Sequence, residues 1–215
     1  MRFLITAGPT REPIDPVRYI SNRSSGKMGY AIAQAALDAG HDVILISGPA
    51  NLAPPRNAKF ISVSTSDEMF DAVHRHADKS EVCVLCAAVA DYKPAQVSPV
   101  KIKKRATQLS LELIPTRDIL DSLGRLQNRK FLLVGFAAET DDLEANATKK
   151  LREKNCDIVV ANDARVAIET DENELLILFR DGDTKKISRA PKKNLARELV
   201  KIFSNSQQKS LTKKM

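Results

Sequence analysis

Short apolar runs alternate with helical patterns along most of this 215-residue chain, and this alternation restricts the possible folds more than any other feature. Continuous apolar runs indicate strands that are buried on both faces. Helical patterns between such strands are typical of a parallel sheet wrapped by helices. We therefore predict an α/β fold with a Rossmann-like, mostly parallel sheet. The strands are expected at 2–7, 42–47, 60–63, 82–86, 131–135 and 157–161, and the helices at 27–39, 67–77 (capped by Ser66), 117–124 and 142–154.

The last third of the sequence changes in character. Two apolar segments, 175–179 and 185–187, flank Arg180-Asp181-Gly182-Asp183, and an Asp-Gly pair in this position predicts a β-hairpin. A closing helix is predicted from Pro191, because proline suits the first helical position. From about Ser204 the chain is polar and basic. We predict a single domain over 1–203, followed by a disordered basic tail over 204–215.

Residues 91–115 interrupt the alternation. The segment contains three prolines, the basic run Lys101-Ile102-Lys103-Lys104-Arg105, and an alternating stretch at 109–113 that predicts a half-exposed strand. Such a long excursion from a compact sheet is usually a lid or an assembly arm. We predict a flap that also serves dimerisation. The alternative is a solvated loop with scattered lysines.

The loop between the first strand and the first helix is the strongest candidate binding site. It runs from Gly8 to Ser24-Ser25-Gly26, directly before the helical pattern. Unpaired amides and the positive end of the helix dipole meet at such a position, so an anion is favoured there. Phosphate is the expected ligand. The alternative is a tight turn that binds nothing.

Two common phosphate signatures do not fit this loop. A Walker loop would need glycine in place of Ser21 and a hydroxyl residue in place of Met28. A dinucleotide site would need an acidic residue after the second strand, where Ser47-Gly48-Pro49 stands. None of the three tyrosines is followed four residues later by lysine. Nucleotide phosphate is therefore the first hypothesis, and an NAD(P)-dependent oxidoreductase is the alternative.

Composition argues against several other classes. The hydrophobic share of 43% is ordinary for a soluble globular protein, and no apolar run approaches the roughly 20 residues of a membrane span. Cys83, Cys86 and Cys156 lie in or beside apolar runs, which predicts buried thiols, with Cys83 and Cys86 on opposite faces of one strand. The net charge of +7 comes partly from the tail, and the basic run lacks aromatic neighbours for base stacking, so no nucleic acid is expected as a partner. A cytoplasmic protein is expected.

Several motifs in one order resemble phosphopantothenate–cysteine ligases, which in many bacteria form the C-terminal half of a bifunctional coenzyme A enzyme. The matching segments are 5–22, 24–29, 86–92, 101–104, 135–140, 154–157 and 161–163. The resemblance implies a nucleotide-binding ligase domain. In it, the carboxylate of phosphopantothenate attacks the α-phosphate of a nucleoside triphosphate, and the amine of cysteine then displaces the nucleotide. It implies CTP, or alternatively ATP, with Mg²⁺, and no flavin or NAD.

The resemblance also implies roles for individual residues. Asn22 would donate to the acyl carbonyl of the intermediate, as in an oxyanion hole, and Lys101 would be a catalytic lysine on the flap. Metal ligands stay unassigned. Where the family commonly has Asn-Pro, this chain has Thr116-Arg117, so the detail of base recognition is open. The expected nucleotide-binding residues are Gly8, Ser24, Ser25, Gly26, Cys86, Ala87, Ala88, Asp91, Arg117, Asp118, Ile119, Leu120, Phe136, Lys150 and Lys154.

The implied partners are phosphopantothenate, L-cysteine and the nucleoside triphosphate. A homodimer is also implied, in which the flap of one subunit reaches the active site of the other. The sequence contains nothing like the flavin-dependent decarboxylase, so a separate phosphopantothenoylcysteine decarboxylase is a further expected partner. No membrane partner is expected.

Overall fold

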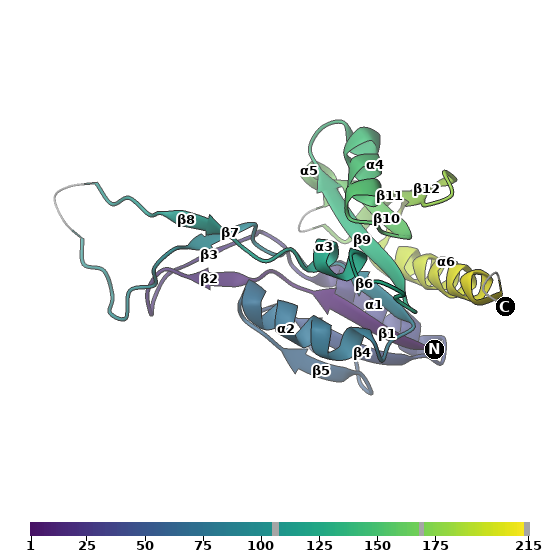
Figure 1. Ribbon diagram of the computed structural model, residues 1–215, viewed down its shortest axis with the longest axis horizontal. Coiled ribbons are helices and arrows are strands. Elements are labelled where there is room, and N and C mark those ends of the chain that lie inside the picture. Colours follow the sequence, from purple (N-terminus) through teal and green to yellow (C-terminus); the bar gives the residue numbers. More distant parts are fainter. Residues whose placement is uncertain (105–107, 168–169, 213–215) are drawn as a thin grey trace.

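The computed structural model describes residues 1–104, 108–167 and 170–212 (Figure 1). Its strands are β1 (Arg2–Ala7), β2 (Arg11–Pro13), β3 (Tyr19–Ser21), β4 (Asp42–Ser47), β5 (Lys59–Ser62), β6 (Val82–Leu85), β7 (Tyr92–Pro94), β8 (Leu113–Pro115), β9 (Leu132–Glu139), β10 (Ile158–Asp163), β11 (Glu172–Phe179) and β12 (Thr184–Pro191). Its helices are α1 (Lys27–Asp38), α2 (Ser66–Ala77), α3 (Ile119–Gly124), α4 (Leu143–Glu153), α5 (Ala164–Ala167) and α6 (Lys192–Thr212).

The main sheet of the described residues has eight strands in the order β12-β11-β10-β9-β6-β1-β4-β5. The strands from β10 to β5 in this order are parallel. The hairpin β11–β12 adds two antiparallel strands at one edge. The predicted α/β fold with a mostly parallel sheet and a C-terminal hairpin is therefore confirmed.

The chain order reverses between β1 and β6. From β1 the chain continues to β4 and β5 on one side, whereas from β6 it continues to β9 and β10 on the other. At such a switch point the connections leave in opposite directions. They therefore open a crevice at the carboxyl ends of the two strands.

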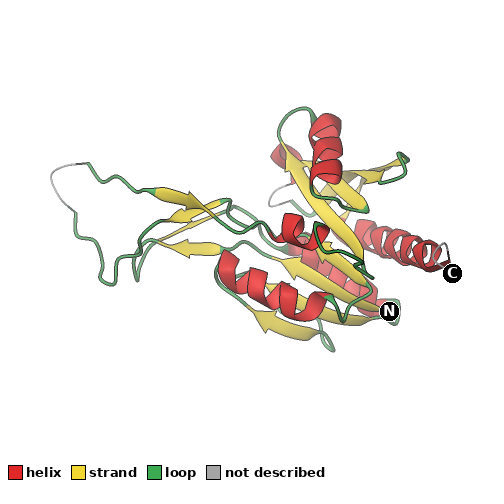
Figure 2. Ribbon diagram, in the orientation of Figure 1, coloured by secondary structure: helices red, strands yellow, loops and turns green. Residues whose placement is uncertain are grey.

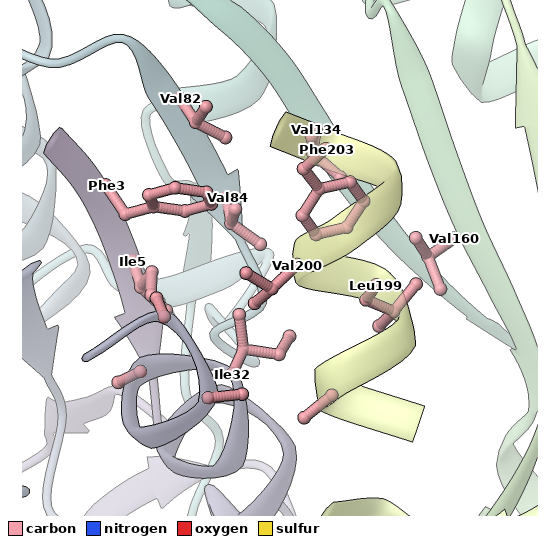
Figure 3. Packing of buried hydrophobic residues seen from close by; sticks show 14 of the residues in the cluster. Phe3, Ile5, Ile32, Val82, Val84, Val134, Val160, Leu199, Val200 and Phe203 are labelled. Atoms are coloured by element: carbon pink, nitrogen blue, oxygen red, sulfur yellow. The ribbon is translucent and has the colours of Figure 1, made fainter. Parts of the chain in front are cut away.

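Helices lie on both faces of the sheet (Figure 2). Helices α1 and α6 pack on one face, where Phe3 and Ile5 of β1 belong to the same apolar cluster as Phe203 of α6 (Figure 3). On the other face, Leu4 belongs to a second apolar cluster formed with α2, α3 and α4. Adjacent strand residues point to opposite faces, so the consecutive residues Phe3, Leu4 and Ile5 of β1 all have to be apolar.

The two cysteines at β6 follow the same geometry. Cys83 is buried in the cluster beneath α2, α3 and α4, whereas Cys86 packs against the cluster beneath α1 and α6. The prediction that they face opposite sides of the sheet is confirmed. Burial raises the pKa of the Cys86 thiol to about 12, so it is neutral at physiological pH.

Helix α6 continues to Thr212, so the prediction of a disordered tail from Ser204 was wrong for residues 204–212. Phe203 is fully buried and Gln207 is 3% exposed. The Gln207 amide donates to the carbonyl of Lys130 at 3.2 Å. A helix needs only one buried stripe, and the four-residue spacing of these two side chains supplies it in a polar segment. The last three residues lie outside the described part.

The N-terminus of α2 differs from the prediction by one residue. Thr65, and not Ser66, is the cap: its Oγ1 accepts a hydrogen bond from the Glu68 amide at 3.2 Å. The Glu68 carboxylate in turn accepts from the Thr65 amide at 3.4 Å. This reciprocal arrangement is a capping box, and Thr65 and Glu68 have the spacing it requires.

Two short antiparallel ribbons, β2–β3 and β7–β8, extend away from the sheet to the left of Figure 1. The strand predicted at 109–113 was wrong except at its last residue, because β8 begins at Leu113 and pairs with β7 over three residues. Leu109, Leu111 and Leu113 are 40–55% exposed. Part of the predicted flap, residues 105–107, lies outside the described residues.

Candidate active site

A cavity of about 730 Å³ lies at the switch point between β1 and β6. Its walls come from the loop that leads into α1, from the segment after β6, and from the segment that leads into α3. Further lining residues come from β1, β6, β9, α4, β10, β11, α5 and α6. Nearly every element at this end of the sheet therefore contributes to one space, which is where doubly wound sheets bind ligands.

The cavity brings together most of the predicted site residues from separate parts of the chain. They are Asn22, Ser24, Ser25, Gly26, Cys86, Ala87, Ala88, Asp91, Arg117, Asp118, Ile119, Leu120, Phe136, Lys150 and Lys154. Gly8 and Lys101 do not line it. Gly8 instead shapes the loop: its φ is +71°, and a Cβ there would lie 2.8 Å from the Gly48 carbonyl oxygen.

The N-terminus of α1 borders the cavity. Gly26 is its cap residue, with φ of 77° and no side-chain cap. One turn later, a Cβ on Gly29 would lie 2.6 Å from the Ala7 side chain, so only glycine lets α1 approach β1 this closely. The helix therefore presents the positive end of its dipole to the cavity, as the predicted phosphate site requires.

Buried hydroxyls connect the segment after β6 to β1 and the loop that follows it. Thr6 Oγ1 accepts hydrogen bonds from the amides of Cys86 and Ala87, both at 3.1 Å. Thr10 Oγ1 accepts from the amide of Ala90 at 3.0 Å. These contacts fix the backbone of residues that line the cavity.

Asn22 lies at the edge of the cavity and contacts the same segment. Its Nδ2 donates to the carbonyls of Ala88 (3.1 Å) and Val89 (3.2 Å). An amide nitrogen has two hydrogens, so both are used by these contacts. To donate to a ligand oxygen, Asn22 has to release one of the two carbonyls.

Lys154 lies in a small ionic cluster at the start of α3. Its Nζ is 2.9 Å from Asp118 Oδ2 and 3.8 Å from Asp121 Oδ1. Burial opposes ionisation of Asp118, but the Asp121 amide and the Lys154 ammonium outweigh it and lower the pKa of Asp118. The hydrogen bond to Asp118 raises the pKa of Lys154. Lys150, one turn before Lys154, lines the cavity without an ion-pair partner among the described residues.

The Arg117 guanidinium is directed to α2. It is 2.9 Å from carboxylate oxygens of Asp67 and of Asp71, and it lies 4.0 Å above the ring of Phe70. These contacts hold the segment before α3 against α2. Arg117, at a position where the family commonly has proline, therefore stabilises the wall of the cavity through its contacts with α2.

Lys101 is exposed on the flap (residues 91–115) and lies outside the cavity. The next residue, Ile102, is held to the β2–β3 ribbon: its amide donates to Asp15 Oδ2 at 3.1 Å, and its carbonyl accepts from Arg18 at 2.8 Å. Asp15 is buried and also forms an ion pair with Arg18. This anchor fixes the base of the flap next to Lys101.

We expect Asp15→Ala to release this anchor, which amide hydrogen exchange at Ile102 would measure. The Arg18 guanidinium holds the pKa of Asp15 well below its usual range, although burial opposes this. A lowered pKa means that the stabilisation is complete above the unfolded pKa of about 4 and is lost only as the pH falls below it. Protection of Ile102 should therefore be constant between about pH 5 and 8 in the wild type and lost throughout this range in the variant. Unchanged protection in Asp15→Ala, with Asp181→Ala as the surface control, would show that the anchor is not needed.

The polar lining residues that were not assigned a role from the sequence include Lys27, Asn162, Asn173 and Lys192. Asn173 lies in β11 at a register shift against β12, and such bulges redirect side chains. Lys192 begins α6 after the antiparallel hairpin has returned the chain to the cavity. Lys27 and Asn162 lie within the matching segments 24–29 and 161–163, whereas no local pattern in the sequence marks Asn173 or Lys192.

The fold and the cavity define a doubly wound α/β protein with a ligand site at its switch point. Residues 1–206 match the family described as "DNA/pantothenate metabolism flavoprotein C-terminal domain". The chain therefore belongs to this family, which confirms the family that its motifs indicate.

Curated relatives are similar over almost the whole chain. It is 46% identical over 209 residues to the coenzyme A biosynthesis bifunctional protein CoaBC of Haemophilus influenzae, covering 96% of this chain and 52% of that protein. It is 45% identical over 201 residues to CoaBC of Bacillus subtilis, covering 92% and 49%. The chain thus spans about half the length of the curated relatives it matches.

Solved structures share the fold. The C-terminal domain of CoaBC has a TM-score of 0.84 at 43% identity, covering 97% of this chain and 96% of that one. A Cab2 mutant in complex with phosphopantothenate-cysteine has a TM-score of 0.81 at 19% identity, covering 99% and 88%. This second likeness concerns the fold alone.

Two features are absent from the described part of the chain. No helix there is long and apolar enough to cross a membrane. The same residues include no group of three or more His, Cys, Asp or Glu side chains that could hold a metal ion.

Proposed function

We propose that this protein joins cysteine to phosphopantothenate, giving phosphopantothenoylcysteine in coenzyme A biosynthesis. The observation that carries the proposal is the cavity at the switch point, which collects the residues expected for this reaction from separate parts of the chain. The 46% identity to a coenzyme A biosynthesis protein supports it. Cab2, which shares the fold, has been solved in complex with phosphopantothenate-cysteine, the compound that this reaction would form.

The reaction would proceed in two displacements. A carboxylate oxygen of phosphopantothenate attacks the α-phosphorus of a nucleoside triphosphate, and pyrophosphate leaves. The amine of cysteine then attacks the acyl carbon of the resulting acyl nucleotidylate, and the nucleoside monophosphate leaves as the amide forms. Activation is necessary because a carboxylate oxygen is a poor leaving group, whereas a nucleoside monophosphate is a good one.

The cavity residues have distinct roles in this proposal. The N-terminus of α1 and the hydroxyls of Ser24 and Ser25 bind phosphate oxygens. Lys150 and Lys154, at the end of α4, attract the nucleotide. Asn22 donates to the acyl oxygen as negative charge develops on it, and Lys101 neutralises charge on the phosphates.

We further propose CTP as the nucleotide, with ATP as the alternative, and Mg²⁺ bound to it as part of the substrate. Triphosphates are normally presented to enzymes with their charge partly neutralised by this ion. Among the described carboxylates, Asp91 and Asp118 line the cavity. Asp118 is already paired with Lys154, which leaves Asp91 as the better candidate to contact hydrated magnesium.

A pyrophosphate-release assay would test the function. With phosphopantothenate and cysteine present, we expect pyrophosphate and phosphopantothenoylcysteine in equal amounts, faster with CTP than with ATP, and almost none in excess chelator. Release should depend on phosphopantothenate, and amide formation on cysteine. Turnover that instead depends on a nicotinamide cofactor would favour the oxidoreductase alternative. In the described structure, no residue of β4 lines the cavity, although β4 is the strand that carries the ribose acid in dinucleotide sites.

We also propose a homodimer, in which the flap of each subunit reaches the cavity of its partner. Lys101 lies outside the cavity of its own chain. The exposed residues Leu109, Leu111 and Leu113 lie on the same flap. Association of two subunits through their flaps would cover these leucines. With two-fold symmetry, each flap would complete the active site of the other subunit. Decarboxylation of the product would fall to a phosphopantothenoylcysteine decarboxylase outside the matched region, and the cytoplasm is the proposed location.

A further inference from the structure

The N-terminal turn of α2 holds the β2–β3 ribbon, the first of the two ribbons that leave the sheet (Figure 1). The Arg11 amide of β2 donates to the Ser64 carbonyl at 2.8 Å. The carboxylate of Glu12, the next residue, accepts a hydrogen bond from the Ser66 amide at 2.8 Å. Glu12 is 1% exposed, so this contact is shielded from water. The start of α2 is therefore the base on which the first ribbon is fixed.

The same turn of α2 holds the second ribbon, β7–β8, through Asp67. Asp67 Oδ2 forms an ion pair with Lys93 of β7. Asp67 Oδ1 lies 2.9 Å from Nε of Arg117, two residues after β8. The hydrogen bond from Lys93 lowers the pKa of Asp67, although burial opposes this, so the carboxylate is charged at neutral pH. One carboxylate thus contacts the chain where it enters the flap and where it leaves it.

Two attachments fix an orientation that one attachment would leave free. Strands β7 and β8 pair with each other, and Thr116 Oγ1 donates to the Ala90 carbonyl at 2.7 Å, so the two strands move as one unit. A ribbon held at one point can rotate about that point, whereas a ribbon held at two points keeps its angle to the sheet. Arg117 also contacts Asp71 and the ring of Phe70. The contact with Lys93 therefore supplies the second point.

Asp67 can act on the reaction only through the flap. Among the described residues, none from α2 lines the cavity. The side chain of Asp67 is 40% exposed, and ion pairs at such exposed positions contribute little to stability. Lys101, in contrast, lies on the flap that Asp67 holds. The expected effect of these ion pairs is therefore on the direction in which the flap carries Lys101.

We propose that Asp67 is a positioning residue, which fixes the angle of the flap so that Lys101 reaches the phosphates in the first displacement. This inference rests on the proposed function and adds to it a residue that lies outside the cavity. Asp67 does not touch the substrate in this proposal. It keeps the flap in the orientation from which the lysine can reach the reacting groups, and a misplacement of about 1 Å can slow a reaction by on the order of 10²-fold.

Asp67→Asn separates the two attachments without changing the size of the side chain. Both neighbours of Asp67, Lys93 and Arg117, are hydrogen-bond donors. Asparagine offers one acceptor oxygen, and its NH₂ group would face the other donor. The variant can therefore hold one strand of the flap but not both. Asp71→Asn, one turn later in α2, is the matched control, because it removes a contact of Arg117 and leaves both attachments to Asp67.

The angle of the flap would be measured as the distance between two nitroxide labels, by pulsed electron paramagnetic resonance. Lys103→Cys on the flap and Lys59→Cys in β5 supply two exposed attachment sites. An excess of unlabelled protein restricts the measured distances to those within one subunit. We expect one narrow distribution of distances without further substitutions and in Asp71→Asn, and a broad one in Asp67→Asn.

The native cysteines interfere little with this labelling. Cys83 and Cys156 are buried, and burial raises the pKa of the Cys86 thiol to about 12. Labelling reagents react with the thiolate, which an exposed cysteine forms far more readily at neutral pH. The labels should therefore attach to the two introduced cysteines.

Quenched-flow kinetics would show whether the angle matters for the reaction. In Asp67→Asn we expect the rate of acyl nucleotide formation to fall by on the order of 10- to 100-fold, while the affinity for Mg²⁺ with CTP stays close to that of the wild type. Lys93→Met should cause the same loss. The double variant should lose no more than either single variant, because both substitutions remove the same contact. A merely structural role would lower the melting temperature without separating rate from affinity.

A narrow distribution in Asp67→Asn, or equal broadening in Asp71→Asn, would overturn the proposal. A wild-type rate despite a broad distribution would also overturn it, because the angle would then have no effect on the reaction. Lys93→Met keeps the test valid if Asp67→Asn does not fold. The distances do not depend on product formation. Failure of the ligase assay in the wild type would therefore reject the proposed function separately from the attachment of the flap.

Discussion

Asn22→Ala is expected to lower kcat by on the order of 10²- to 10³-fold, the usual cost of losing one oxyanion-hole donor. The Asn22 amide lies at the edge of the cavity, where it donates to the carbonyls of Ala88 and Val89. In the proposed mechanism it releases one of these carbonyls and donates to the acyl oxygen instead. Binding energy gained only as the charge develops lowers the barrier without tightening ground-state binding. KM for phosphopantothenate should therefore change much less than kcat.

The same variant must remain folded for the assignment to hold. Asn22 is exposed, and both of its backbone contacts are at the surface end of the segment after β6, so we expect a loss of no more than about 1 kcal/mol in the free energy of unfolding. Asn51→Ala, at another exposed asparagine, is the control. Turnover close to that of the wild type would exclude an oxyanion role, and a large fall in melting temperature would show a structural one.

Lys101→Gln is expected to suppress formation of the acyl nucleotide while nucleotide binding stays largely intact. The lysine is on the flap and lies outside the cavity of its own chain. It would therefore contribute its charge only when the flap closes on the phosphates. Quenched-flow experiments would measure the intermediate directly. An intermediate that accumulates at the wild-type rate would show that Lys101 has no role in the first displacement.

Mixing the two inactive variants tests whether the site is shared between subunits. In a heterodimer of Asn22→Ala and Lys101→Gln, one site would lack both groups and the other would have both. Random exchange should then restore about a quarter of the wild-type activity, because half of the dimers are mixed and each has one intact site. No recovery after proven exchange would mean that each flap serves its own chain. A monomer in sedimentation would contradict the dimer itself.

Local patterns in the sequence determined most of the secondary structure and the position of the loop that leads into α1. The apolar run at Phe3-Leu4-Ile5 in β1 indicated a strand buried on both faces, and Phe3 and Leu4 do enter opposite clusters. The Asp-Gly turn likewise specified a hairpin, in which Gly182 adopts a φ of +98°. Such features follow from short segments because periodicity and backbone freedom are properties of neighbouring residues.

The tertiary structure alone decided which distant residues meet. Lys192 enters the cavity because the β11–β12 hairpin reverses the chain beside β10, and nothing near Lys192 in the sequence encodes that return. Residues 204–212 are helical because α6 packs on the sheet and Gln207 reaches the Lys130 carbonyl, although their composition alone predicts disorder. Lys101 is outside the cavity because its neighbour Ile102 is held by Asp15. Each of these placements depends on contacts between segments far apart in the chain, and the free energy of those contacts outweighs local preference.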